Sequence, residues 1–137
     1  MIDDYMRRAR HLARQTGFTK IDEIQIDLRN CKTRADETQQ LLPPAPNMRY
    51  VILDERGKAL TSRQMAAQLS SWRDDGDQAV SFVIGGADGF EPAALPTGVT
   101  RWAFGPQTWP HKFVRVMLAE QVYRMLSILA GTPYHRD

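Results

Sequence analysis

The C-terminal tail of this chain places three kinds of reactive side chain next to one another. Tyr134 carries a hydrogen-bonding phenol, His135 an imidazole that can titrate near neutral pH, and Arg136 a planar guanidinium that matches phosphate. Short polar tails usually fray. We therefore expect these residues to serve catalysis only where another surface orders them.

Three further segments fall where the strands of an open α/β sheet would end, and ligands bind beyond the carboxyl ends of such strands. They are Leu53-Asp54, the glycine-rich run Gly85–Gly89 and the loop Phe104–His111. The glycine run matches neither the dinucleotide fingerprint nor a phosphate-binding loop, and by itself it is more often a turn than a site. Trp109 has two interpretations, because its ring can wall an adenine pocket or plug the core beneath the loop.

The elements that must position these segments alternate along the chain. Apolar spacing predicts helices over residues 2–16, 33–42, 62–73 and 112–129, the third with capping-box spacing at Thr61 and Gln64. Strands are predicted at 24–28, 50–53, 79–84 and 100–104. Because the inner strands are apolar throughout, we predict an α/β fold with a mostly parallel sheet and helices on both faces.

Length and composition indicate one ordinary globular domain, residues 1–137. The chain is 42% hydrophobic and 25% charged. The prolines at 43, 44 and 46 end a helix, and we interpret them as a loop because neither half of the chain has enough apolar residues for its own core. No segment approaches the roughly 18 apolar residues of a membrane span, and the acidic N-terminus lacks a secretory pattern, so we expect a cytoplasmic protein.

The charged residues, the cysteine and the histidines indicate less about function than the segments above. Cys31 is the single cysteine and the three histidines are scattered, so we predict no disulfide and no metal site. The net charge of +2 is too small to establish nucleic-acid binding. Arginines crowd the first helix, but charge runs of this kind are usually solvated faces. They are Arg7, Arg8, Arg10 and Arg14.

Five motifs carry a more specific pattern. They are Phe82-Val83-Ile84-Gly85-Gly86-Ala87-Asp88-Gly89, Gln107-Thr108-Trp109-Pro110-His111, Val114-Arg115-Val116, Glu120-Gln121-Val122-Tyr123-Arg124 and Pro133-Tyr134-His135-Arg136-Asp137. In order and spacing they resemble the RlmH family of ribosomal RNA large-subunit methyltransferases, of the SPOUT class. The resemblance covers residues 49–137 well and the earlier part loosely.

The resemblance implies a fold, a reaction and a partner. The family forms a homodimer, ties its C-terminal segment into a trefoil knot and transfers a methyl group from S-adenosyl-L-methionine (SAM). Its target is N3 of pseudouridine 1915 in helix 69 of 23S rRNA, which we expect to be met on assembled ribosomes. We expect the family's first strand to be missing from this chain, and Ala87 and Asp88 stand where Pro and Glu are frequent in the family.

Site residues follow from the resemblance. The SAM-binding positions are Leu53, Gly85, Phe104, Gly105, Pro106, Gln107, Thr108 and Trp109. The expected catalytic residues are His135, as a base or to orient the uracil, Tyr134 as its hydrogen-bonding or stacking partner, and Arg136 as an anion holder. Arg115 and Arg124 are expected to bind RNA.

Two alternatives and one interface remain open. The first alternative is a catalytically impaired module of the same fold that binds RNA or the ribosome. The second is a generic nucleotide-binding α/β enzyme, against which the missing phosphate motifs count. Val116 and Tyr123 on the last helix are candidates for the dimer interface, or they fill the core of one subunit.

Overall fold

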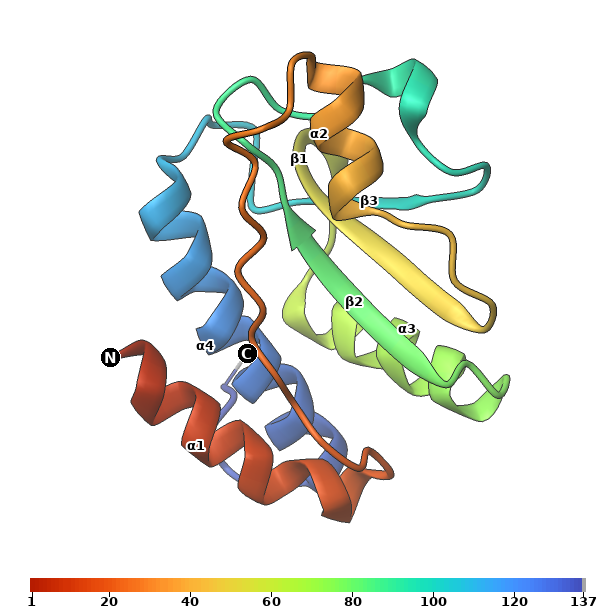
Figure 1. Ribbon diagram of the computed structural model, residues 1–137. Coiled ribbons are helices and arrows are strands. Elements are labelled where there is room, and N and C mark those ends of the chain that lie inside the picture. Colours follow the sequence, from red (N-terminus) through yellow and green to blue (C-terminus); the bar gives the residue numbers. More distant parts are fainter. Residues whose placement is uncertain (137) are drawn as a thin grey trace. The chain divides into compact units, whose positions relative to one another are not determined.

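The chain forms two compact units in a computed structural model that describes residues 1–136, with Asp137 outside the described residues (Figure 1). Unit 1 consists of Met1–Glu23, Leu60–Gly76 and the chain from Lys112 onwards. Unit 2 consists of Ile24–Ala59 and Asp77–His111. The proline-rich segment lies inside unit 2, which confirms that it is a loop and not a boundary. The single domain stays a prediction.

Unit 1 is helical. Its helices are α1 (Ile2–Ala13), α3 (Ser62–Asp74) and α4 (His111–Ala130), close to the predicted ranges. The face of α1 with apolar residues three and four apart is buried, as its periodicity predicts. The capping box of α3 is also confirmed, since the Thr61 hydroxyl accepts from the Gln64 amide at 3.1 Å and the Gln64 side chain accepts from the Thr61 amide at 2.9 Å.

Three contacts join the helices within unit 1. The Arg73 guanidinium donates to the Thr16 carbonyl at 2.6 Å and so ties α3 to the end of α1. The Ser62 hydroxyl donates to the Gln121 side chain at 2.8 Å and ties α3 to α4. The rings of Tyr5 and Tyr123 pack between α1 and α4 with centroids 6.2 Å apart.

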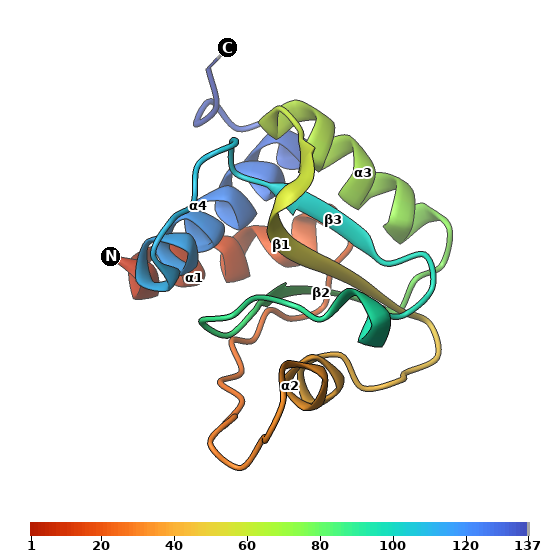
Figure 2. The same ribbon diagram turned by 90° about the horizontal axis from the view of Figure 1, so that it is seen from above.

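Unit 2 is built on a parallel sheet. Its strands are β1 (Met48–Ala59), β2 (Ala79–Ile84) and β3 (Thr100–Ala103), in the order β2-β1-β3. Figure 2 shows α2 (Arg34–Leu41) along one face of this sheet. A buried cluster lies on that side and includes Leu42, Ile52, Val83 and Phe90. The parallel sheet and its α/β class are thereby confirmed.

Two strand predictions were wrong. Residues 24–28 form no strand, and Ile24 is 79% exposed, because alternation of apolar residues supplies no partner strand. Strand β1 does not end at Leu53 but continues through the polar segment to Ala59, with an irregular register against β3 between Leu53 and Lys58. The trefoil knot and the missing first strand stay predictions.

Neither a membrane span nor a metal cluster is found within residues 1–136. No helix there is both long and apolar enough to cross a bilayer. No three His, Cys, Asp or Glu side chains of that part are grouped so that they could hold a metal ion.

Candidate active-site elements

The expected cofactor segments meet at one edge of the sheet in unit 2. Leu53 on the central strand is paired with Ile84 of β2 on one side and with Trp102 of β3 on the other. Gly85 directly follows β2, and Phe104 directly follows β3. Because the strands are parallel, Gly85 and Phe104 leave the sheet at the same edge, on either side of the still continuing strand β1, and α/β proteins hold their ligands at the carboxyl ends of such strands.

Gly85 packs closely against a neighbouring side chain. A Cβ atom at this position would lie 3.0 Å from the ring of Phe90, a side chain that is itself buried. The segment that carries Phe90 is held by α2, since the Glu91 amide donates to the Thr38 hydroxyl at 2.9 Å. Arg34 also pairs with Glu91 at 2.6 Å and lowers the pKa of that carboxyl. Because Gly85 has no side chain, a ligand bound at this position would contact the backbone atoms of Gly85.

Two side-chain hydrogen bonds hold the loop after β3, one within the loop and one to strand β1. The Trp109 indole nitrogen donates to the Phe104 carbonyl at 3.0 Å, and the Thr108 hydroxyl donates to the Glu55 carboxylate. Gly105 has a φ of +92°, a backbone conformation that L side chains rarely adopt. Trp109 is 39% exposed, so the interpretation that it plugs the core was wrong.

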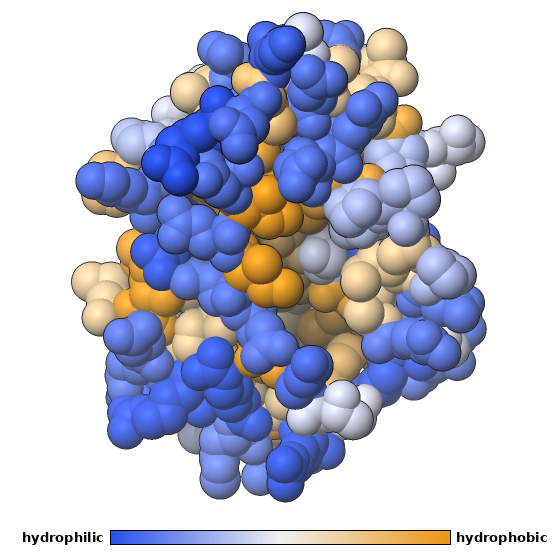
Figure 3. Space-filling model, viewed as in Figure 1, coloured by the Kyte–Doolittle hydropathy of each residue, from blue (hydrophilic) through white to orange (hydrophobic). Residues whose placement is uncertain are grey.

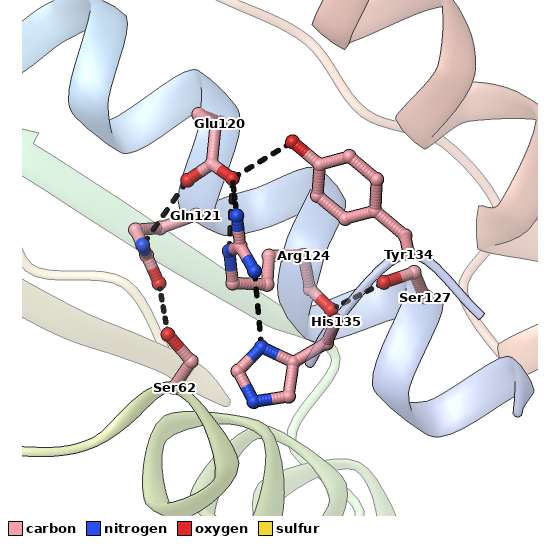
Figure 4. A network of polar contacts seen from close by, with 7 residues as sticks. All are labelled: Ser62, Glu120, Gln121, Arg124, Ser127, Tyr134 and His135. Carbon is pink, nitrogen blue, oxygen red and sulfur yellow. Dashed lines mark hydrogen bonds and ion pairs between the residues drawn. The ribbon is translucent and has the colours of Figure 1, made fainter. Parts of the chain in front are cut away.

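The C-terminal tail is ordered by α4 of the same unit (Figure 4). The Thr132 amide donates to the Ser127 carbonyl at 3.0 Å and turns the chain back. The Tyr134 hydroxyl donates to Glu120 Oε1 at 3.0 Å, and the Tyr134 ring lies 4.5 Å from the Tyr123 ring. This tail therefore has the supporting surface that catalysis by it would need.

Arg124 is the centre of this network (Figure 4). It pairs with Glu120 Oε1 at 2.6 Å, lies 4.7 Å over the Tyr134 ring and approaches His135 Nδ1 at 3.0 Å through Nη1. A guanidinium can only donate, so Nδ1 accepts and the neutral His135 ring carries its proton on Nε2. Nε2 is then a hydrogen-bond donor.

Tyr134 is a neutral phenol at physiological pH. Its burial, together with the hydrogen bond to Glu120, raises its pKa from 10.0 to about 12. Its hydroxyl already donates to Glu120, so a role as donor or packing partner fits it better than a role as base.

The remaining expected site residues are less closely grouped. Arg136 is exposed, and Arg115 is half exposed and paired with Glu23 at 2.6 Å. The guanidinium of Arg124 is committed to the tail network, and the Tyr123 ring packs against Tyr5 and Tyr134 within unit 1. The RNA contacts of Arg115 and Arg124 and the dimer contacts of Val116 and Tyr123 stay predictions.

Several supporting residues were not identifiable as such from the sequence. Phe90 and Thr38 hold the glycine-rich turn, Glu55 holds the loop after β3, and Glu120 holds the tail. Only Glu120 carried a signal, because its spacing of four from Arg124 is that of a helical ion pair. The others are brought to their sites by tertiary packing.

A family model described as predicted SPOUT methyltransferase matches residues 1–135. The chain belongs to the SPOUT methyltransferase family. The motifs had indicated this class, and the match confirms it. Membership of a SPOUT methyltransferase family gives no support to a generic nucleotide-binding enzyme.

Similar curated SPOUT proteins are named ribosomal RNA large subunit methyltransferase H. The one from Maricaulis maris is 51% identical over 138 residues, which cover 100% of this chain and 88% of that protein. The one from Hyphomonas neptunium is 47% identical over 99% of this chain and 88% of that protein. The one from a Bradyrhizobium species is 42% identical with the same coverage. The chain therefore belongs to the RlmH group of the SPOUT family.

Proposed function

We propose that this protein transfers the methyl group of SAM to N3 of pseudouridine 1915 in helix 69 of 23S rRNA. The observation that carries the proposal is identity of up to 51%, over the whole chain, to proteins named ribosomal RNA large subunit methyltransferase H. We further propose that it acts as a knotted homodimer on assembled ribosomes in the cytoplasm.

The carboxyl edge of the sheet in unit 2 is the proposed SAM site. SAM would supply an electrophilic methyl group on a sulfonium. The backbone at Leu53, Gly85 and the loop 104–109 offers amide and carbonyl groups for an adenine edge, and the half-exposed Trp109 ring offers a flat wall. The hydrogen bond from Trp109 to Phe104 pre-shapes this loop, which lowers the entropy lost on binding.

The C-terminal network is proposed to act on the uracil ring. The N3 proton passes to solvent water before methyl transfer, and the negative charge left on the ring spreads onto the neighbouring carbonyl oxygens. His135 Nε2, held as a donor by Arg124, is suited to stabilise that charge and to orient the ring. Arg136 would hold a nearby phosphate or the developing anion. Alignment of nucleophile and methyl carbon can contribute about 7–11 kcal/mol.

Methyl transfer from labelled SAM to 70S ribosomes, compared with free 23S rRNA, tests the function. We expect label on the ribosomes, mapped to N3 of that pseudouridine. Binding of ribosomes without any transfer at saturating SAM would instead support the impaired RNA-binding module. Label on another base would overturn the proposed target.

Two pairs of variants test the assigned residues. Gly85→Val should displace Phe90 and abolish SAM binding in calorimetry, whereas Ala87→Val, at an exposed position of the same loop, should not.

His135→Gln keeps a hydrogen-bond donor and should retain more methyltransferase activity than His135→Ala. Equal loss of activity in the two His135 variants would favour a base over a donor.

A further inference from the structure

A basic groove lies beside α1, apart from every residue assigned so far. Its volume is about 630 Å³. Three of its lining residues come from α1, one from the turn directly after the helix and four from the chain that follows. They are Arg7, Arg10, His11, Arg14, Thr19, Lys20, Ile21 and Asp22. All of them belong to the first segment of unit 1, so one continuous stretch of chain forms the groove.

One backbone hydrogen bond and one side-chain hydrogen bond position the two walls of the groove. Gly17 takes a left-handed conformation after α1, and the Phe18 amide donates to the Ala13 carbonyl at 2.8 Å. The chain then turns back along the helix (Figure 1), where Arg10 Nε donates to the Ile21 carbonyl at 2.9 Å. The two walls are therefore fixed to one another, and the surface over α1 is largely hydrophilic (Figure 3).

The charge of the lining is strongly one-sided. Four cationic side chains and one carboxylate, that of Asp22, line the groove, and Asp22 pairs with Lys20 at 3.3 Å. Arg7 also pairs with Asp4, which lies outside the lining. Within residues 1–136, the terminal nitrogens of Arg10 and Arg14 make no hydrogen bond. Both side chains are exposed, and guanidinium forks match phosphate oxygens in a bidentate manner.

The spacing of the arginines suits a repeating polyanion. Arg7, Arg10 and Arg14 follow one another at three and four residues, and Arg14, directly after α1, keeps a helical backbone conformation. The three therefore lie on one face and span roughly 10 Å at the helical rise. Apart from Ile21 the lining offers no apolar anchor, which protein interfaces usually require at their centre. This row of arginines therefore suits a phosphate backbone better than it suits the surface of a folded protein.

We propose that this groove binds the sugar-phosphate backbone of the RNA substrate and positions it without reading its sequence. The proposal deepens the proposed function and rests on it for the identity of the RNA. It assigns a role to arginines that the sequence pattern alone would leave as a solvated helix face. Backbone contacts of this kind set affinity and register, while other residues choose the target base.

The affinity of the full-length protein for purified ribosomes, measured over a series of salt concentrations, tests the groove. Arg14→Gln should weaken binding roughly threefold to tenfold and reduce the slope of log affinity against log salt by about one. The KM for ribosomes should rise by the same factor, while kcat and SAM binding stay unchanged. Arg14→Lys should recover most of the affinity because the charge is kept.

Arg8→Gln is the matched control. Arg8 lies on the same helix but outside the groove, and it pairs with Asp4 at 3.2 Å. An equal loss of ribosome affinity in Arg8→Gln would overturn the proposed role of the groove. An unchanged slope of log affinity against log salt in Arg14→Gln would overturn it as well. So would Arg14-dependent binding of a poly-glutamate peptide together with unchanged ribosome binding.

The two proposals can fail separately. The wild-type protein could bind ribosomes with a salt dependence that Arg14→Gln reduces and yet transfer no methyl group. That result would contradict the proposed function and still support RNA binding by the groove. Full methylation by Arg14→Gln with the wild-type KM for ribosomes would contradict RNA binding by the groove and still support the proposed function.

Discussion

The Tyr134 phenol links stability to pH in a defined window. Its pKa is about 12 in the folded chain because of burial and the bond to Glu120, against about 10 in an unfolded chain. Between these values the unfolded chain ionises and the folded chain does not. The stabilisation is therefore complete below pH 10 and is lost as the pH rises towards 12.

Tyr134→Phe should remove this pH dependence. We expect the variant to lose less stability than the wild type between pH 10 and 12, in urea unfolding followed by circular dichroism. The absorbance titration of the folded wild type should show a phenol, missing in the variant, that ionises near pH 12. Identical stability profiles for the two proteins would contradict the assignment.

Glu120 and Glu23 allow a matched comparison of two ion pairs with arginine. The side chains of the Glu120–Arg124 pair are 18% and 24% exposed, whereas those of the Glu23–Arg115 pair are 44% and 52% exposed. Glu120→Gln should cost about 1.5–3 kcal/mol, since it weakens charged hydrogen bonds in a partly buried network. Glu23→Gln should cost about 0.2–1 kcal/mol. Equal shifts of the urea midpoint would contradict this order.

The tail shows what a list of residues can and cannot predict. Tyr134, His135 and Arg136 were identifiable from their chemistry and from the resemblance. Their geometry was not, because the contacts of Tyr134 with Glu120 and of His135 with Arg124 form only after the tail turns back beyond the end of α4. That contact changes the expected role of His135, since it fixes which ring nitrogen carries the proton.

Helix α3 begins with a capping box whose contribution can be measured directly. Thr61→Ala removes the hydroxyl that accepts from the Gln64 amide and should cost about 1 kcal/mol in urea unfolding. Ser71→Ala, at an exposed position within the same helix, is the control and should change stability by less than about 0.5 kcal/mol. A Thr61 variant as stable as the control would show that the cap does not hold this helix.

Helices were predicted better than strands for a physical reason. A helix satisfies its own backbone hydrogen bonds, so the spacing in α1 and the cap of α3 suffice to predict them. A strand depends on its neighbours. Residues 24–28 alternate without gaining a partner, whereas the polar segment 54–59 becomes a strand because β3 pairs with its end.

The expected site residues are divided between two units that interleave in sequence. The expected SAM-binding positions all lie in unit 2, and the expected catalytic and RNA-binding residues all lie in unit 1. The order of motifs gave the expected site residues, which stay predictions. It could not predict this division, because each unit is assembled from segments that long stretches of sequence separate.

The proposed homodimer gives this division a test with mixed subunits. If the tail of one subunit acts at the cofactor site of its partner, Gly85→Val and His135→Ala subunits should complement one another. A two-fold dimer has two equivalent sites, so a mixed dimer would hold one intact site, and a random equal mixture should recover about a quarter of the wild-type rate. The measurement is methyl transfer to ribosomes after co-refolding of the two variants, each of which serves alone as a control. A mixture as inactive as either variant would mean that each site is built within one subunit, since both kinds of site in the mixed dimer would then carry a defect.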